Sequence, residues 1–436
     1  MKNTSLFKII LLGVFGLAAL VGIFVFATYS GGGGSSSGQV GTVVIWGTLP
    51  SADMQAALVA ITKTESSLKS VSYVEKDPAT LPSDLATAIA TGAAPDLVLA
   101  SQEELTSLEK FITPLPSSTL SSSVFTNTFV GGSSVFAAQD GYYGIPFLVD
   151  PLLLYANRDI LSSDGIVKPP ATWEALAGLA PNVAILTPAR QITRGLIALG
   201  TYDNVHDARA ILSSLFLQAG VSLSSHSTSG VLSADLGESS VSGSGMPPGQ
   251  SVLGFYTQFA DPSKVSYTWN ASLPDSEQAF AAGDLALYLG YASEARFLAQ
   301  ASPNLNVVVT PLPQPATATV KKAYGLIYAL MIPNGAKNAS GAYQAAVLLT
   351  NAAEQTAAAS ATGLAPAVLS DLATPPTDPV GSVAYAEALY VYGWLSPSPA
   401  SVDSVFSGMI KDVISGRSTI TSALASAQQS LSALLQ

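Results

Sequence analysis

One carboxylate lies in the middle of a strongly apolar stretch, and its position is chemically informative. Asp150 falls within "GYYGIPFLVDPLLLYANRDIL", residues 141–161, whose apolar side chains predict a buried strand. Removing a carboxylate from water without a partner costs several kcal/mol. Asp150 is tolerable if the strand emerges at a water-filled cleft, where a carboxylate accepts strong hydrogen bonds from hydroxyl groups. The alternative is an aspartate satisfied by backbone N–H groups at a strand end.

Three aromatic residues stand at predicted strand ends or loops and could offer flat apolar surfaces to a ring-shaped ligand. Trp46 ends the strand predicted over 42–48, where open α/β sheets place their ligands. Tyr291 ends a second strand, and Trp394 lies between a Ser/Pro-rich loop and a helix. The chemistry would be stacking of an aromatic face on an apolar ring face. For Trp46 the alternative is packing in the core.

Polar side chains near the same positions could add hydrogen bonds. We select Thr48 after the first strand, Ser101 and Gln102 just past the strand at 94–100, and two tyrosines, Tyr143 and Tyr324, on or before apolar strands. Each could instead serve the fold.

Composition excludes several classes of site. The chain has no cysteine, so disulfides, thiolate metal sites and a lipid-modified cysteine are absent. Its two histidines, His206 and His226, are predicted to be surface residues and give little basis for a metal site or a Ser-His-Asp triad. We predict no cofactor and no metal. The net charge of −11, without a Lys/Arg cluster, argues against nucleic acid as a partner.

The N-terminus carries an export signal. Lys2 and Lys8 precede an unbroken apolar run at 9–27, whose 19 residues would span roughly 28 Å as a helix. The run is longer than a typical cleavable signal and lacks a clean cleavage site, so we predict an uncleaved anchor over 1–29. A Gly/Ser linker at 30–40 follows. The lysines place the rest of the chain outside the cell, tethered to the cytoplasmic membrane. A cleaved signal is the alternative.

Strand and helix patterns alternate through the rest of the chain, which predicts an α/β fold with a mainly parallel sheet. Strands are expected at 42–48, 70–76 and 94–100. The helix between the last two is expected to have Ser83 as N-cap and Gly92 just past its end. Thr172 is predicted to be the N-cap of a later helix, and Thr419 is predicted to start the last one. With 436 residues, the chain is too long for one hydrophobic core, so two lobes are expected.

The order of these motifs resembles the extracellular solute-binding proteins of ABC importers, in particular the sugar-binding, maltose-binding-protein-like family. The resemblance covers nearly the whole chain after residue 41. It rests on stretches that stand in the family's order: "VVIWGT", "LATAIATGAAPDLVLAS", "YYGIPFLVDPLLLYANRDIL" leading into "PPATWEAL", "QAFAAGDLALYLGY", "NVVVTPLPQ", "AYGLIYALMIPNGAKN" and "SGRSTITSALASAQQSL". Many relatives carry a lipid-modified cysteine after the signal; here the apolar anchor would replace it.

The resemblance implies a two-lobed, periplasmic-binding-protein-like (type II) fold with hinge strands and a ligand cleft between the lobes. "YGIPF" would be the first crossover and "AYGLIYAL" the second. Lobe 1 is then expected over 41–147 plus 325–380, and lobe 2 over 150–320 plus 385–436.

The function implied is capture of a small ligand, expected to be a carbohydrate, and its delivery to ABC permease subunits by a monomeric, non-catalytic protein. Hinge closure would report that the ligand is bound. Two alternatives stay open. One is a sensory or adhesion protein on the same fold. The other is an extracellular glycosidase, which needs two carboxylates across a cleft that no motif singles out.

Overall fold

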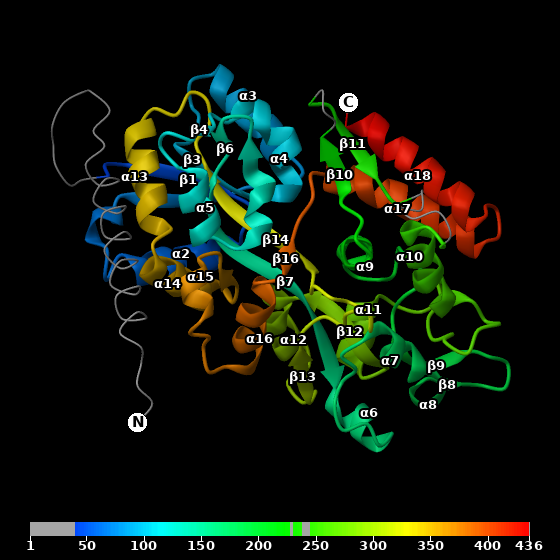
Figure 1. The fold of residues 1–436 in the computed structure, drawn as a ribbon. Helices are drawn as coiled ribbons and strands as arrows, with labels where there is room; N and C mark the ends of the chain where they lie inside the picture. Colours follow the sequence, from blue (N-terminus) through cyan, green and yellow to red (C-terminus); the bar gives the residue numbers. More distant parts are fainter. Residues whose placement is uncertain (1–39, 227–229, 238–244, 436) are drawn as a thin grey trace, which may run out of the picture. The chain divides into compact units, whose positions relative to one another are not determined.

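The computed structural model describes residues 40–226, 230–237 and 245–435 (Figure 1). The predicted anchor at 1–29 and almost all of the linker lie outside the described residues. Among the helices of the described ranges, none is long and apolar enough to cross a membrane.

A single mixed sheet runs through the molecule. Its strands follow the order β2-β1-β3-β14-β7-β12-β9-β8, with β13 and β15 added on β7 and β16 on β14. Their bounds are β1 (Val43–Gly47), β2 (Val71–Glu75), β3 (Leu97–Ser101), β7 (Ile145–Asn157), β8 (Ile185–Leu186), β9 (Ile192–Ile197), β12 (Leu285–Tyr291), β13 (Val307–Thr310), β14 (Ala323–Met331), β15 (Ala365–Pro366) and β16 (Val391–Tyr392). We call the part with β1, β2, β3, β14 and β15 the first half, and the part with β8, β9, β12 and β13 the second half.

The long strand β7 belongs to both halves. Its 13 residues are all buried, and in Figure 1 it runs through the centre of the molecule. Residues from Ile145 to Pro151 pair with β14, whereas Leu152 to Ala156 pair with β12. Asp150 therefore lies where the strand changes partners. Two small sheets lie apart from this one: β4 (Leu115–Pro116), β6 (Gly141–Tyr142) and β5 (Ala137–Ala138), and the hairpin of β10 (Leu223–His226) with β11 (Leu232–Asp235).

The expectation of a mainly parallel sheet is wrong at the centre. The pairs β1–β2, β1–β3 and β9–β12 are parallel, as alternating strands and helices predict. In contrast, β14 runs antiparallel to both β3 and β7, and β12 runs antiparallel to β7. The reason is that β7 carries the chain from the first half to the second and β14 carries it back, so the two strands lie side by side in opposite directions.

Helices cover the sheet. Their bounds are α2 (Ser51–Ile61), α3 (Leu81–Ala90), α4 (Gln102–Leu108), α5 (Ser122–Thr128), α6 (Arg158–Ser163), α7 (Trp173–Gly178), α8 (Ala180–Val183), α9 (Ala208–Gln218), α10 (Pro248–Thr257), α11 (Ser276–Ala282), the 3₁₀ turn η5 (Ala292–Glu294), α12 (Ala295–Ala301), α13 (Ala339–Leu349), α14 (Ala352–Thr362), α15 (Leu369–Leu372), α16 (Pro379–Ala388), α17 (Pro399–Ile414) and α18 (Ile420–Leu434). Helices α2 and α14 pack together on the first half; α9 packs against β14, and α10, α17 and α18 gather beside the β10–β11 hairpin (Figure 1). The lobe boundaries given above stay a prediction.

Most of the predicted helix ends are confirmed. Thr172 and Thr419 accept hydrogen bonds from the third backbone N–H of their helices, and Gly92 has the left-handed φ of +68° that ends α3. The prediction for Ser83 is wrong. Helix α3 begins at Leu81, because Pro82 suits the first turn, where its missing N–H is not needed.

Candidate functional site

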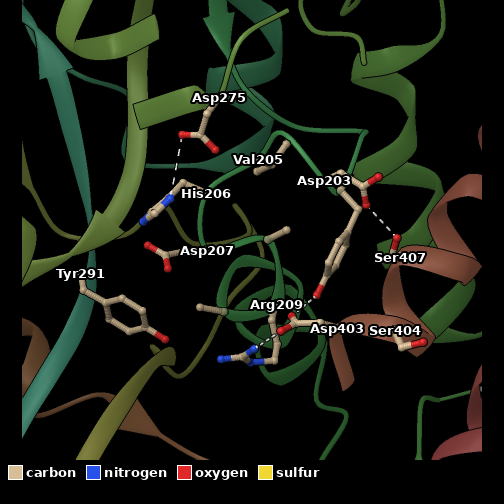
Figure 2. Close-up of a pocket in the computed structure, with 13 residues that line it drawn as sticks. Asp203, Val205, His206, Asp207, Arg209, Asp275, Tyr291, Asp403, Ser404 and Ser407 are labelled. Atoms are coloured by element: carbon tan, nitrogen blue, oxygen red, sulfur yellow. Dashed lines mark hydrogen bonds and ion pairs between the residues drawn. The ribbon is translucent and has the colours of Figure 1, made fainter. Parts of the chain in front are cut away.

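A cavity of about 560 Å³ opens where β9 and β12 end (Figure 2). These two strands are parallel, so their carboxyl ends meet at the same edge, where α/β sheets place ligands. The loop after β9 supplies one wall, Tyr291 at the end of β12 another, and α17 a third. The lining residues are Tyr202, Asp203, Val205, His206, Asp207, Ala208, Arg209, Ala210, Asp275, Tyr291, Asp403, Ser404 and Ser407.

Arg209, in the first turn of α9, is the centre of an ionic network at this cavity. Its Nε and Nη2 donate to the two carboxylate oxygens of Glu103 at 3.1 and 2.9 Å, and its Nη1 donates to Asp403 Oδ2 at 2.6 Å. Tyr324 in β14 also donates its hydroxyl to Glu103. A two-pronged Arg–carboxylate contact fixes direction as well as distance. The network therefore ties α4 of the first half to α9 and α17 beside the second half.

Helix α4 holds Glu103 in place through its own cap. Ser101 accepts from the Glu103 backbone N–H, and the Glu104 side chain accepts in return from the Ser101 backbone N–H and hydroxyl. Burial, and next the charge of Glu103, raise the pKa of Glu104 to about 7. Two carboxyl groups thus lie side by side at the start of α4. Of the two, Glu103 forms an ion pair with an arginine and Glu104 does not.

A second group of acidic residues lies at the cavity and includes Asp207, which lines it. Asp207 is the N-cap of α9 and adopts a left-handed φ of +54°. Burial, and next the nearby charge of Glu294, raise its pKa well above the ordinary value. Glu294 in η5 accepts hydrogen bonds from the Tyr291 N–H at 2.9 Å and from the Tyr288 hydroxyl. Gly290 makes room for this contact, because a Cβ there would lie 2.4 Å from Glu294 Oε2.

Asp150 is buried next to this group. It is 3% exposed and accepts a hydrogen bond from the Ser293 N–H at 3.1 Å. Burial raises its pKa to about 7, although the bonds from Ser293 oppose the shift. Asp150 is not among the residues that line the cavity. The backbone-satisfied alternative therefore describes its present contacts, and its role toward a ligand stays a prediction.

Three of the other predicted residues meet at the junction of the halves. Ser101 caps α4, and Gln102 is fully buried, where its amide donates to the Gly325 carbonyl at 3.0 Å and accepts from the Ile327 N–H at 2.7 Å. Tyr324 bonds to Glu103 and is 1% exposed. These contacts are structural, but they hold the network that borders the cavity.

Four predicted residues lie away from the cavity lining. Trp46 is half-buried, with the Lys76 ammonium 3.9 Å from its ring centre. Thr48 follows β1 and is also half-buried, as is Tyr143, whose pKa is raised by burial and by Glu109.

Trp394 is 3% exposed, packs in the core of the second half and donates from Nε1 to Ser213 Oγ at 3.1 Å. Of the three aromatics selected first, Tyr291 alone lines the cavity.

The sequence reading missed the charged residues of the site. Glu103, Arg209, Glu294 and Asp403 were not selected, and His206, expected at the surface, lines the cavity with its side chain 41% exposed. One signal was available: the polar stretch "TYDNVHDAR" follows an apolar strand and begins a helix, which is the position that α/β folds use for ligands. His226 is exposed, as expected.

Comparison with known proteins identifies the family. The family model described as "Bacterial extracellular solute-binding protein" matches residues 57–380. The chain belongs to this family. Among curated proteins, no sequence matches. As a solute-binding protein, the chain binds rather than transforms its ligand, so the prediction of a non-enzymatic binding protein is confirmed. The family description also places its members outside the cell.

Solved structures support the two-part fold of this solute-binding protein. A cyclo/maltodextrin-binding protein complexed with maltotetraose matches with a TM-score of 0.71 at 16% identity, covering 92% of this chain and 99% of that one. The GacH receptor of Streptomyces glaucescens GLA.O, solved unliganded and with acarbose, gives 0.66 at 16% identity, with 91% and 98% covered. A Thermus thermophilus maltotriose-binding protein gives 0.63 at 16% identity, with 91% and 100% covered. These likenesses establish the fold; the ligands belong to those proteins.

Proposed function

We propose that this solute-binding protein captures a carbohydrate in the cavity beside Arg209 and Tyr291. The Arg209 network carries the proposal, because Arg209 and Asp403 line the cavity and Arg209 also bonds to Glu103 on α4 of the first half. Carboxylates and a guanidinium bind hydroxyl groups strongly, and the tyrosine ring offers a face for a sugar ring. The ligands named for the structures of similar fold are saccharides: maltotetraose, mannobiose and maltotriose.

Thermal melts of the full chain with a ligand panel test the proposal. Maltotriose, maltotetraose, mannobiose and acarbose form the test set, and free amino acids form the control set. A ligand that binds only the folded state raises the melting temperature by mass action. We expect at least one saccharide, and no amino acid, to do so. A panel in which no saccharide shifts the melt would overturn the carbohydrate assignment.

Tyr291→Ala tests whether the cavity is the binding site. We expect this variant to lose about 1–3 kcal/mol of binding free energy, the effect typical of truncating an aromatic residue at an interface. Phe297→Ala is the matched control, because Phe297 is 53% exposed and does not line the cavity. Titration calorimetry with the saccharide from the panel gives both affinities. Equal affinity in Tyr291→Ala and the parent would place the ligand elsewhere.

We further propose that ligand binding closes the two halves about β7 and β14 and that the closed protein delivers its ligand to an ABC permease. Opening must separate Glu103 on α4 from Arg209 on α9, so this ion pair favours closure without ligand. Small-angle scattering with and without saccharide measures the change. If the radius of gyration is the same in both states, hinge closure is rejected.

The predicted anchor at 1–29 completes the proposal: it would keep the protein at the outer face of the cytoplasmic membrane, near its permease. The motivation is the uninterrupted apolar run at 9–27 and the absence of a cysteine for lipid attachment. N-terminal sequencing of the protein from membrane and medium fractions tests it. A mature form that begins near Ser30 and is released into the medium would contradict the tether.

A further inference from the structure

Three residues with metal-binding side chains converge beside the cavity. His206 and Asp207 come from the loop before α9, and Glu294 comes from η5, which follows β12. One side-chain ligand atom from each lies within 4.8 Å of the other two. His206 and Asp207 also line the cavity, as Figure 2 shows.

A second, independent observation concerns the carboxylate of Asp207. Its Oδ2 is buried and has no hydrogen-bond partner among the described residues. A buried polar atom normally has a partner, because leaving it without one costs about 1–3 kcal/mol. The residue that Asp207 faces is Glu294, whose side chain is also a carboxyl group. No N–H or O–H group of the described residues therefore donates to Asp207 Oδ2.

Burial raises the pKa of Asp207 and the nearby charge of Arg209 lowers it, but among the described residues no cation forms a hydrogen bond to Asp207 Oδ2. Arg209, two residues along α9, already binds Glu103 and Asp403 through Nε, Nη1 and Nη2. Glu294 accepts from Tyr291 and Tyr288, and among the described residues it forms no ion pair. The cluster therefore has carboxyl oxygens that no donor of the described residues occupies.

We propose that His206, Asp207 and Glu294 bind a divalent transition-metal ion of the Zn²⁺ or Mn²⁺ type. Two carboxylates balance the charge of the ion, and an imidazole nitrogen favours such ions over Ca²⁺ or Mg²⁺. Zinc bonds of about 2.0–2.2 Å require these side chains to turn inward slightly. The remaining coordination positions of the bound ion would face the cavity.

His206 also forms a second group of the same kind with Asp275 and Glu277. Its Nδ1 lies 3.9 Å from Asp275 Oδ1. Asp275 already accepts from the Glu277 N–H as the cap of α11, so this group serves the fold. The buried oxygen without a partner belongs to the first group, which is why the proposal is confined to it. The proposal goes beyond carbohydrate binding and does not depend on it.

Equilibrium dialysis of the full chain, first stripped with EDTA, against ZnCl₂, MnCl₂ and CaCl₂ tests the site without any sugar. We expect one zinc or manganese ion per chain and a rise in melting temperature. Asp207→Asn and His206→Ala should each bind the ion at least about tenfold more weakly. Asn tolerates the left-handed backbone at position 207, so that variant should fold, and metal-free melts check this.

Asp284→Asn is the matched control, since Asp284 is an exposed aspartate in the turn before β12, outside the cluster. It should bind the metal as the parent does. Three results would overturn the proposal: no saturable binding of zinc or manganese at millimolar concentration, parental affinity in both Asp207→Asn and His206→Ala, or tighter binding of calcium that His206→Ala leaves unchanged.

Discussion

Two ionisable residues at the start of α9 have opposite surroundings. Arg209 has carboxylates on two sides and forms charge-assisted hydrogen bonds to both. Asp207, two residues earlier, faces the carboxyl of Glu294, and its Oδ2 has no partner among the described residues. The same cavity is thus lined by a cation that is bonded to its acidic partners and by a carboxyl group with one oxygen that lacks a partner among the described residues. The first holds elements together, whereas the second is free to receive a ligand, an ion or a proton.

Among the substitutions that test this comparison, Arg209→Met should change the free energy of unfolding most. The change leaves Glu103, whose side chain is 7% exposed, without its cation. Breaking a buried pair typically costs 3–5 kcal/mol; because the Arg209 side chain is 21% exposed, we expect a loss of about 2–4 kcal/mol in the free energy of unfolding. Urea denaturation measures it.

Arg417→Met provides the control, because the Arg417–Asp412 pair is on the surface, with side chains 66% and 41% exposed. It should cost less than about 1 kcal/mol. Adding Glu103→Gln to Arg209→Met should restore part of the loss. Equal effects of the two arginine variants would mean that the Arg209 network contributes no more than an exposed pair.

Lowering the pH should stabilise the protein through buried carboxyl groups that form no ion pair. Burial raises the pKa of Asp150 and of Glu104 to about 7 in the folded state, above the unfolded values of 3.8 and 4.5. Between these limits the folded state binds more protons than the unfolded state, so stability falls as pH rises through this window. We expect a loss of at least about 2 kcal/mol between about pH 4 and pH 8.

Asp150→Asn should flatten this pH profile, since it removes one of the titrating groups. Urea denaturation at a series of pH values measures both chains. A parent protein whose stability rises from acidic to neutral pH would show that these carboxyl groups are satisfied as anions. The carboxylates that form ion pairs, and not Asp150 and Glu104, would then determine how stability depends on pH.

Asp207→Asn should have the smallest effect and the opposite sign to Arg209→Met. In EDTA at about pH 8, the amide removes one of two facing carboxylates and provides a donor, so we expect a gain of about 1 kcal/mol in unfolding free energy. Asn also accepts the left-handed φ of +54°. A loss of stability in EDTA would mean that the ionised carboxylate is satisfied in the folded state, and the contrast with Arg209 would disappear.

The sequence predicts the elements of this fold better than it predicts the site. Local patterns locate the strands that end at Gly47, Ser101 and Tyr291, because buried runs and turn residues are properties of neighbouring positions. The Glu103–Arg209 pair joins residues 106 positions apart, and no local pattern predicts such a pairing. Trp394 shows the converse: a loop-like context suggests exposure, but packing from distant helices buries the ring.

The position of β14 between β3 and β7 also bears on when the protein can fold. Strand β7 ends at Asn157, but its partner over the first half, β14, begins only at Ala323. Pairing of this kind closes a very long loop, which makes it a slow step. While the chain is being synthesised, the first half therefore lacks its central strand until residues 323–331 have left the ribosome. An exported protein gains from this delay, since a chain that has not yet completed its sheet can still be threaded through a membrane channel.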